Sequence, residues 1–251
     1  MTSLALQTQT DMGGRLSVLT RQKRDHVRLN ELLNELAQAP PGPAEEHVLR
    51  KIARLVFPHA FAEESVLWPV MRRVLPDGEP LTLRVEQEHQ EVNELWTSLE
   101  ELASDDPRRE PVLDRSTRVL QEDVRDEEDV LLPRLQERIS VRRLQALGVA
   151  WEVVRRISPT RPHPVVARRP PGNAIAALPL TLTDRARDHL DRVALRSSRF
   201  RDPAERASDR LARLAGRIET LPIMQRGERP ATHRPPEAPG PVTAGANGGR
   251  A

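Results

Sequence analysis

The strongest constraint on the fold of this chain is an internal repeat in its first half. Residues 25–33 (DHVRLNELL) match residues 88–96 (EHQEVNELW) at an offset of 63 positions. Residues 59–69 (HAFAEESVLWP) match residues 123–133 (DVRDEEDVLLP) at an offset of 64 positions. A repeat of this kind predicts two helical hairpins of the same design that pair into one bundle.

The spacing of apolar residues supports a helical reading of both copies. Four stretches, at about residues 16–37, 44–74, 81–102 and 111–138, carry apolar residues at helical intervals and are separated by segments rich in Pro, Gly or Asp. Sustained alternation of apolar and polar residues is absent, so we expect no β-strands. The sequence therefore predicts an all-α fold, with an antiparallel up-down four-helix bundle over residues 15–139.

The composition changes after Ser140. We expect a C-terminal helical extension over residues 140–222, made of one helix at about 141–157, a Pro-rich extended linker at 158–180 and a helical hairpin to about 220. Residues 223–251 are rich in Pro and Gly and poor in apolar groups, which predicts a disordered tail.

Several polar residues of the repeat occupy positions on the apolar stripes of the predicted helices. Three histidines and an aspartate face the core, and a glutamate follows one turn after His59 and after Asp123. Burial of these groups without partners would cost several kcal/mol each, whereas a pair of divalent metal ions would offset that cost. The predicted metal ligands are His26, His59, Glu63, His89, Asp123 and Glu127. The alternative is a bundle that keeps the fold and has lost the ion.

The other polar residues receive a simpler interpretation. Glu64 and Glu128 are expected on a solvated face, because a Glu-Glu pair usually lies on such a face. The four remaining histidines, which lie at a helix start, in Pro-rich segments or on the extension, are expected at the surface: His47, His163, His189 and His233.

These motifs resemble the hemerythrin/HHE cation-binding family. The likeness rests on Asp25-His26, on His59-x3-Glu63-Glu64 with Trp68-Pro69, on Glu88-His89, and on Glu127-Glu128 with Leu132-Pro133, and it covers about residues 15–140. It implies a four-helix bundle with a non-haem di-iron centre in its core, in which Glu63 and Glu127 bridge the ions. Members of the family bind O2, sense oxygen, iron or nitric oxide, or handle peroxide and iron.

The chain departs from the family pattern at two positions. Asp123 stands where the family offers a histidine, and Asn93 stands where oxygen carriers have a second histidine one turn after His89. The extra carboxylate would favour the ferric state and oxidation over a reversible O2 adduct. Asn93 and Asn30 would line an open coordination position or support the ligands. If Asp123 does not reach a metal, a mononuclear or empty site remains. A ferritin-like site is disfavoured, because Glu86-x-x-His89 has no second copy in the bundle.

The composition limits the class of partner. The chain has no Cys, which excludes disulfides, thiolate zinc sites and Cys nucleophiles. It has no apolar run long enough for a bilayer and no signal-peptide pattern at its start, so we expect a cytoplasmic protein without a membrane partner. Aromatic residues make up only 2%, which is atypical of proteins that stack single-stranded nucleic acid.

Residues 140–235 carry 20 arginines and 9 acidic residues. We interpret the arginine excess as codon bias, and the interspersed acids disfavour nucleic acid as a partner. The C-terminal helices could bind a protein partner or self-associate. The leading hypothesis is a non-haem di-iron protein, with Mn or Zn as other possible ions, that senses or handles O2 or a similar small ligand rather than a metabolic enzyme. The alternatives are a metal-free interaction module and a regulator with a basic C-terminal half.

Overall fold

The computed structural model of the chain describes residues 2–233. This part of the chain is helical and contains no strand, which confirms the predicted all-α fold. None of its helices combines the length and the apolar character that a membrane span requires.

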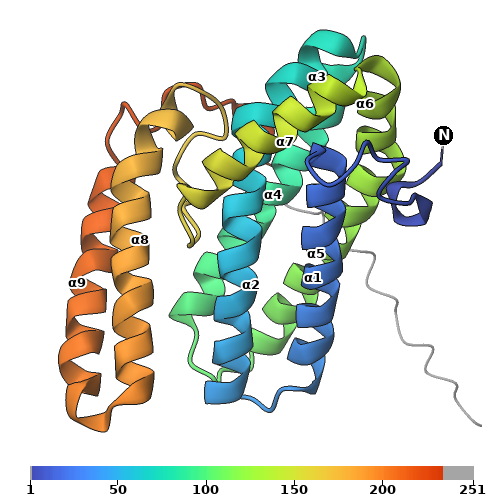
Figure 1. The fold of residues 1–251 in the computed structure, drawn as a ribbon. Coiled ribbons are helices and arrows are strands. Elements are labelled where there is room, and N and C mark those ends of the chain that lie inside the picture. The colour runs from blue at the N-terminus through green and yellow to red at the C-terminus, as the bar shows by residue number, and fades with distance from the viewer. Residues whose placement is uncertain (1, 234–251) are drawn as a thin grey trace, which may run out of the picture.

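The first copy of the repeat forms two neighbouring helices joined by a short turn (Figure 1). Helix α1 spans Val18–Gln38 and begins where the Ser17 side chain accepts a hydrogen bond from the Leu19 backbone N–H. Helix α2 spans Pro43–Ala62 and continues through a π-helical turn, η2 (Glu63–Leu67), into α3 (Trp68–Val74). The turn before α2 contains Gly42 at φ 105°, a conformation that favours glycine.

The second copy has the same construction. Helix α4 spans Gly78–Glu101, α5 spans Arg109–Asp126, and a second π-helical turn, η3 (Glu127–Leu131), leads into α6 (Leu132–Arg138). Helix α4 starts close to the end of α3, where a Cβ on Gly78 would lie 2.5 Å from the Met71 carbonyl oxygen. Only glycine fits this approach, so the two hairpins are joined by a tight turn.

The two π-helical turns occupy equivalent positions in the repeat. The Trp68 N–H donates to the Glu63 carbonyl, and the Leu132 N–H donates to the Glu127 carbonyl, in each case across five residues. The next residue is Pro69 or Pro133, which has no N–H and whose ring crowds the carbonyl four residues earlier in a regular α-helix. A wider turn relieves that crowding, and such turns are frequent at functional sites.

Two apolar clusters fill the bundle. Between them lies a layer of buried polar residues, called the polar layer below, which contains His26, His59, Glu63, His89 and Glu127. One cluster contains Leu19, Trp68 and Leu131, and the other contains Leu29, Ile52 and Trp96 together with their neighbours. Along α1, His26 lies between Leu19 and Leu29, so the chain itself passes from one cluster to the other through the polar layer.

The extension begins with α7 (Val141–Arg156), which packs on α1 and α2 at one end of the bundle (Figure 1). Helix α7 approaches the backbone just before α1 closely because residue 148 is a glycine. A Cβ added at this position would lie 2.0 Å from the Leu16 carbonyl oxygen. Trp151 of α7 is fully buried against the bundle. Thus α7 closes the layer that contains the polar residues.

Helices α8 (Gly172–Arg196) and α9 (Arg201–Glu219) form a hairpin that stands beside the bundle, next to α2 (Figure 1). Helix α8 starts at Gly172, so the last part of the predicted extended linker, residues 172–180, is helical. Ala176 and Leu180 are buried against Ala215 of α9, and this long-range packing is not visible in the Pro-rich sequence.

The structure also differs from the predicted tail. Residues 223–233 pack on the linker and on α4: Met224 and Thr232 are buried, and backbone N–H groups of Ala167 and Gly172 donate to the carbonyls of Met224 and Arg226. These bonds order a segment whose side chains carry little apolar surface. The rest of the predicted disordered tail, residues 234–251, lies outside the described residues.

Candidate metal centre

Six elements each carry one of the predicted ligands into the polar layer. They are His26 of α1, His59 of α2, Glu63 of η2, His89 of α4, Asp123 of α5 and Glu127 of η3. The three histidines and the two glutamates are buried, and Asp123 is half-buried. The side chains therefore face inward, as the repeat predicted.

One side of the layer is rich in nitrogen. His26 Nε2 lies 3.1 Å from Glu127 Oε2, and His59 Nε2 lies 3.2 Å from Glu63 Oε1. The two imidazole rings are 5.2 Å apart between centroids. His26, His59 and Glu127 present ligand atoms that all lie within 4.8 Å of one another, an arrangement that could hold a metal ion.

The other side is rich in oxygen. His89 Nε2 lies 3.6 Å from Glu63 Oε2 and 3.5 Å from Asp123 Oδ1. Glu63, His89 and Glu127 form a second group with ligand atoms within 4.8 Å. Glu127 belongs to both groups, so its carboxylate is placed to be shared. Asp123 approaches His89 without joining either group.

The carboxylates of this layer lack hydrogen-bond donors. Both side-chain oxygens of Glu63 and both of Glu127 are buried without a hydrogen bond, and so are Oδ1 of Asp123 and Nε2 of His89. Buried carboxylate oxygens normally have partners, because the desolvation cost is otherwise uncompensated. The unpaired atoms are oxygen and imidazole nitrogen, the donor types that divalent transition-metal ions bind.

The Nδ1 atoms of two histidines, which point away from the layer, contact glutamates that the sequence predicted on a solvated face. The Nδ1–H of His26 donates to Glu128 at 2.8 Å, and the Nδ1–H of His89 donates to Glu64 at 2.9 Å. Our prediction that Glu64 and Glu128 are solvated is therefore wrong: Glu64 is buried and Glu128 half-buried. The wide π-turn lets two consecutive glutamates both face inward. Their occurrence in both copies of the repeat was the available signal.

His59 has a partner of a different kind. Its Nδ1 lies 3.5 Å from Asp25 Oδ2, and its ring packs edge-on against Trp151 of α7 with centroids 5.2 Å apart. Each histidine thus points Nε2 into the layer and Nδ1 at a carboxylate. That pairing fixes the ring orientation and leaves Nε2 as the nitrogen available to a metal.

Without a metal, several side chains of the layer bind protons more tightly than they would in water, because opposite or like charges lie close to them. Burial opposes the cationic form, but the nearby carboxylates of Glu127 and Glu128 raise the pKa of His26 to about 9. Burial likewise opposes charge on His59, yet Glu63 and Asp25 raise its pKa to about 10. Burial and the nearby Glu63 and Asp123 charges raise the pKa of Glu127 to about 8. A metal cation entering here replaces these protons.

Asn93 and Asn30 have different surroundings. The Asn93 side chain donates to the His89 carbonyl at 2.8 Å, and its Oδ1 accepts the His163 backbone N–H at 2.9 Å, so it ties the extension to α4. Asn30 is exposed on α1. Contrary to the prediction, His163 is buried: its ring contacts Glu219 at 2.8 Å and Asp184 at 3.0 Å. The surrounding prolines gave no periodicity that would reveal this.

The inward arrangement of repeated His and Glu residues has a counterpart among known families. Residues 17–135 match the family model of the hemerythrin HHE cation binding domain. The match takes in almost the whole bundle and just under half of the chain, so the bundle is similar to this family. A hemerythrin-like domain implies metal binding, and the two His/Glu groups of this chain could hold the ions.

A hemerythrin-like protein of Schizosaccharomyces pombe is 25% identical over 135 residues, which make up 53% of this chain and 66% of that protein. The similarity therefore covers less than two thirds of the relative and about half of this chain. No solved structure matches the chain significantly.

Proposed function

We propose that the hemerythrin domain holds a pair of non-haem iron ions and that the protein senses or handles O2 or a related small oxidant in the cytoplasm. The proposed ligands are His26, His59, Glu63, His89, Asp123 and Glu127, in an antiparallel up-down four-helix bundle. The observation that carries the proposal is the set of buried, unpaired oxygens on Glu63 and Glu127 between three histidines.

Each ligand has a role that follows from its position. Glu63 faces His59 and His89, and Glu127 belongs to both ligand groups, so these two carboxylates are suited to bridge two ions. The histidines are suited to bind one ion each through Nε2, because Nδ1 is engaged by a carboxylate. Mixed imidazole and carboxylate ligands suit Fe, with Mn and Zn as other candidates.

A hollow on the bundle surface leads toward this layer. It lies between α1 and α5, has a volume of about 490 Å³, and is lined by His26 and Glu128 together with apolar residues such as Leu29, Leu33 and Leu120. A small neutral molecule such as O2 is compatible with an entrance that is lined in part by apolar side chains. When bound, a ferrous pair would supply electrons to an oxidant; the protein supplies the entrance, the orientation of the histidines and the exclusion of bulk water.

The decisive experiment compares metal content and optical spectrum. The protein is expressed with ferrous iron and purified without air, and its iron is measured before and after oxygen is admitted. We expect about two iron ions per chain and a near-ultraviolet absorption that grows on exposure to air. A Glu63→Ala/Glu127→Ala variant should lose both, because it removes the two proposed bridges.

The matched control is Glu137→Ala, which removes an exposed carboxylate from α6 and should change neither iron content nor spectrum. Circular dichroism of all three proteins separates loss of metal from loss of fold. Equal iron in the bridge variant and the parent would refute the assignment. Zinc or manganese in place of iron would refute the redox role and leave the metal site.

A further inference from the structure

A second hollow lies between the bundle and the extension, on the side away from the α1–α5 entrance. It has a volume of about 440 Å³, within the range of small-ligand sites, and is formed by α2, the end of α7, the linker and α8. Five of its lining residues are arginines and one is acidic: Arg54, Arg155, Arg156, Arg185, Arg192 and Asp188. We refer to it as the arginine groove.

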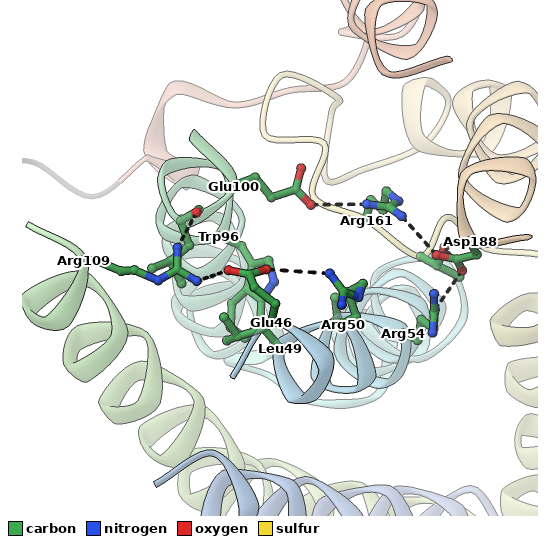
Figure 2. A pocket seen from close by; sticks show the side chains of 12 residues that line it. Glu46, Leu49, Arg50, Arg54, Trp96, Glu100, Arg109, Arg161 and Asp188 are labelled. Atoms are coloured by element: carbon green, nitrogen blue, oxygen red, sulfur yellow. Dashed lines mark hydrogen bonds and ion pairs between the residues drawn. The ribbon is translucent and has the colours of Figure 1, made fainter. Parts of the chain in front are cut away.

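The neighbouring hollow shows what a balanced set of charges looks like in this protein (Figure 2). There, Arg109 and Arg50 both reach Glu46, and Arg161 lies between Glu100 and Asp188. The row ends at the ion pair of Arg54 with Asp188, at 3.1 Å. Every arginine drawn in Figure 2 has a carboxylate partner, and the pairs Arg54–Asp188 and Arg161–Glu100 join the extension to the bundle.

The arginine groove, which shares Arg54 and Asp188 with that hollow, is not balanced. The acids next to it are shared among several cations. Asp188 also interacts with Arg161, at 3.3 Å. Glu152, on the adjoining face of α7, lies within 4.0 Å of four guanidinium groups, those of Arg21, Arg24, Arg155 and Arg156. Arg155 also lies 3.5 Å from Asp25. Three of the five groove arginines therefore have a carboxylate partner, and the positive excess of the groove comes from the other two.

Two of the arginines have no carboxylate partner in the described part of the chain. Arg185 donates to the carbonyl oxygen of Arg156 at 2.5 Å, and Arg192 donates to that of Asp188 at 3.1 Å. Both are exposed on α8, and both keep further N–H groups available. Guanidinium groups that converge on a hollow bind oxyanions through paired hydrogen bonds.

We propose that the arginine groove binds a small multivalent anion of the phosphate type, free or as part of a larger metabolite. An anion with several oxygens and two or more charges can accept hydrogen bonds from Arg185 and Arg192 together and from the remaining N–H groups of their neighbours, which a single carboxylate matches less well. A hollow bounded on three sides by helices favours a small ligand over the extended backbone of a nucleic acid. This function lies outside the metal layer and does not require the metal.

The test is calorimetric titration of the full chain with inorganic pyrophosphate and, separately, with inorganic phosphate, at about 0.15 M ionic strength so that diffuse attraction is screened. We expect saturable binding at one site per chain. Tighter binding of pyrophosphate would identify a diphosphate group as the ligand, and equal binding would identify a single phosphate; both support the proposal.

The variant that tests the location is Arg185→Gln/Arg192→Gln, which removes the two arginines without carboxylate partners. Its affinity should fall at least about tenfold, because the charge-assisted hydrogen bonds from both guanidinium groups are lost. The control is Arg206→Gln/Arg213→Gln, a pair on α9 with the same charge and the same spacing of seven residues, exposed and outside the groove. It should leave the affinity within about twofold, since exposed charges are screened.

Four results would overturn the proposal. They are the absence of saturable binding of either probe, an equal loss of affinity in both variants, a loss of binding when the metal is removed by chelation, and tight binding of a short DNA duplex that pyrophosphate does not displace. The third result would assign the probe to the metal layer, and the fourth would assign the arginines to nucleic acid.

Discussion

The two hairpins of the bundle carry the same motif but place it in different surroundings. In both, a histidine on the first helix donates through Nδ1 to a glutamate of the opposite hairpin, His26 to Glu128 and His89 to Glu64. The distances of 2.8 and 2.9 Å are nearly equal. The shared motif thus produces a near-symmetric pair of supports around the layer.

The hairpins differ in what surrounds these supports. The His26–Glu128 pair faces the α1–α5 hollow, whereas Glu64 is buried beneath the extension with Arg168 at 3.8 Å. The second histidine of the first hairpin, His59, has Asp25 and Trp151 as neighbours, and its counterpart in the second hairpin is Asp123. A duplicated motif therefore gives one open, nitrogen-rich half and one covered, oxygen-rich half.

The largest difference between the halves should appear when the non-equivalent ligands are removed. We expect His59→Ala to lower metal affinity by more than the roughly 10- to 100-fold that loss of a supporting hydrogen bond causes, because a buried imidazole ligand disappears. Asp123→Ala should cost less than about tenfold, because Asp123 joins neither ligand group. Competition with a chromogenic chelator measures both. Equal losses would mean that the two halves contribute alike.

The supporting glutamates offer a sharper comparison. Glu64→Gln and Glu128→Gln should each lower metal affinity by about 10- to 100-fold, because each weakens the orientation of one histidine. Glu64→Gln should also reduce the free energy of unfolding by about 1–3 kcal/mol, since it leaves the buried Arg168 without its nearby carboxylate. Chemical denaturation of the metal-free variants separates these effects. If Glu128→Gln destabilised the chain as much, the covered and open halves would be equivalent.

The metal-free and metal-bound forms should respond to pH in opposite directions. The pKa of His26 is raised to about 9 and that of His59 to about 10, from 6.5, so the folded apoprotein binds protons more tightly than the unfolded chain. The stability that these two histidines contribute is fully present below pH 6.5 and is lost as pH rises toward 9–10. Metal affinity should rise over the same window, because the ion competes with those protons. Thermal unfolding with and without chelator tests this; a metal-free protein that gained stability with pH would contradict it.

The smallest expected effect is a gain. Asp123→His makes the second hairpin resemble the first at this position and offers a further nitrogen ligand beside His89. We expect the affinity for the second ion to rise by about tenfold or less. The new imidazole would lack an orienting carboxylate and a packed ring such as Asp25 and Trp151, which contact His59. Two-step titration with Mn(II), followed by magnetic resonance, measures it. A loss of metal would show that the site requires a carboxylate at this position.

The part of the site that the sequence revealed is the part that obeys helical periodicity. His26, His59 and His89 interrupt apolar stripes, and the repeat places Glu63 one turn after His59 and Glu127 one turn after Asp123. These five residues meet in the structure as ligand groups. The burial of Glu64 and Glu128 was not predicted, because adjacent residues of a regular α-helix point about 100° apart and only one of two consecutive glutamates was expected to face the core.

The extension shows a different limit. His163 lies between two prolines, and its burial depends on Asn93, Asp184 and Glu219, which are distant in sequence. No local pattern encodes a contact of that kind. Likewise, residues 223–233 are ordered by backbone bonds to the linker rather than by apolar side chains of their own.

The wide turns at Glu63 and Glu127 have a consequence for the lengths that this protein tolerates. Each turn holds one residue more than an α-helix would, so the helical segments before and after it are out of phase by about 100°. Deleting a single residue between Glu63 and Pro69 would rotate Trp68 and Met71, now fully buried, toward solvent. Related chains should therefore tolerate insertions and deletions in the 102–108 loop. They should keep the length of the two π-helical turns, Glu63–Leu67 and Glu127–Leu131, even where the side chains there differ.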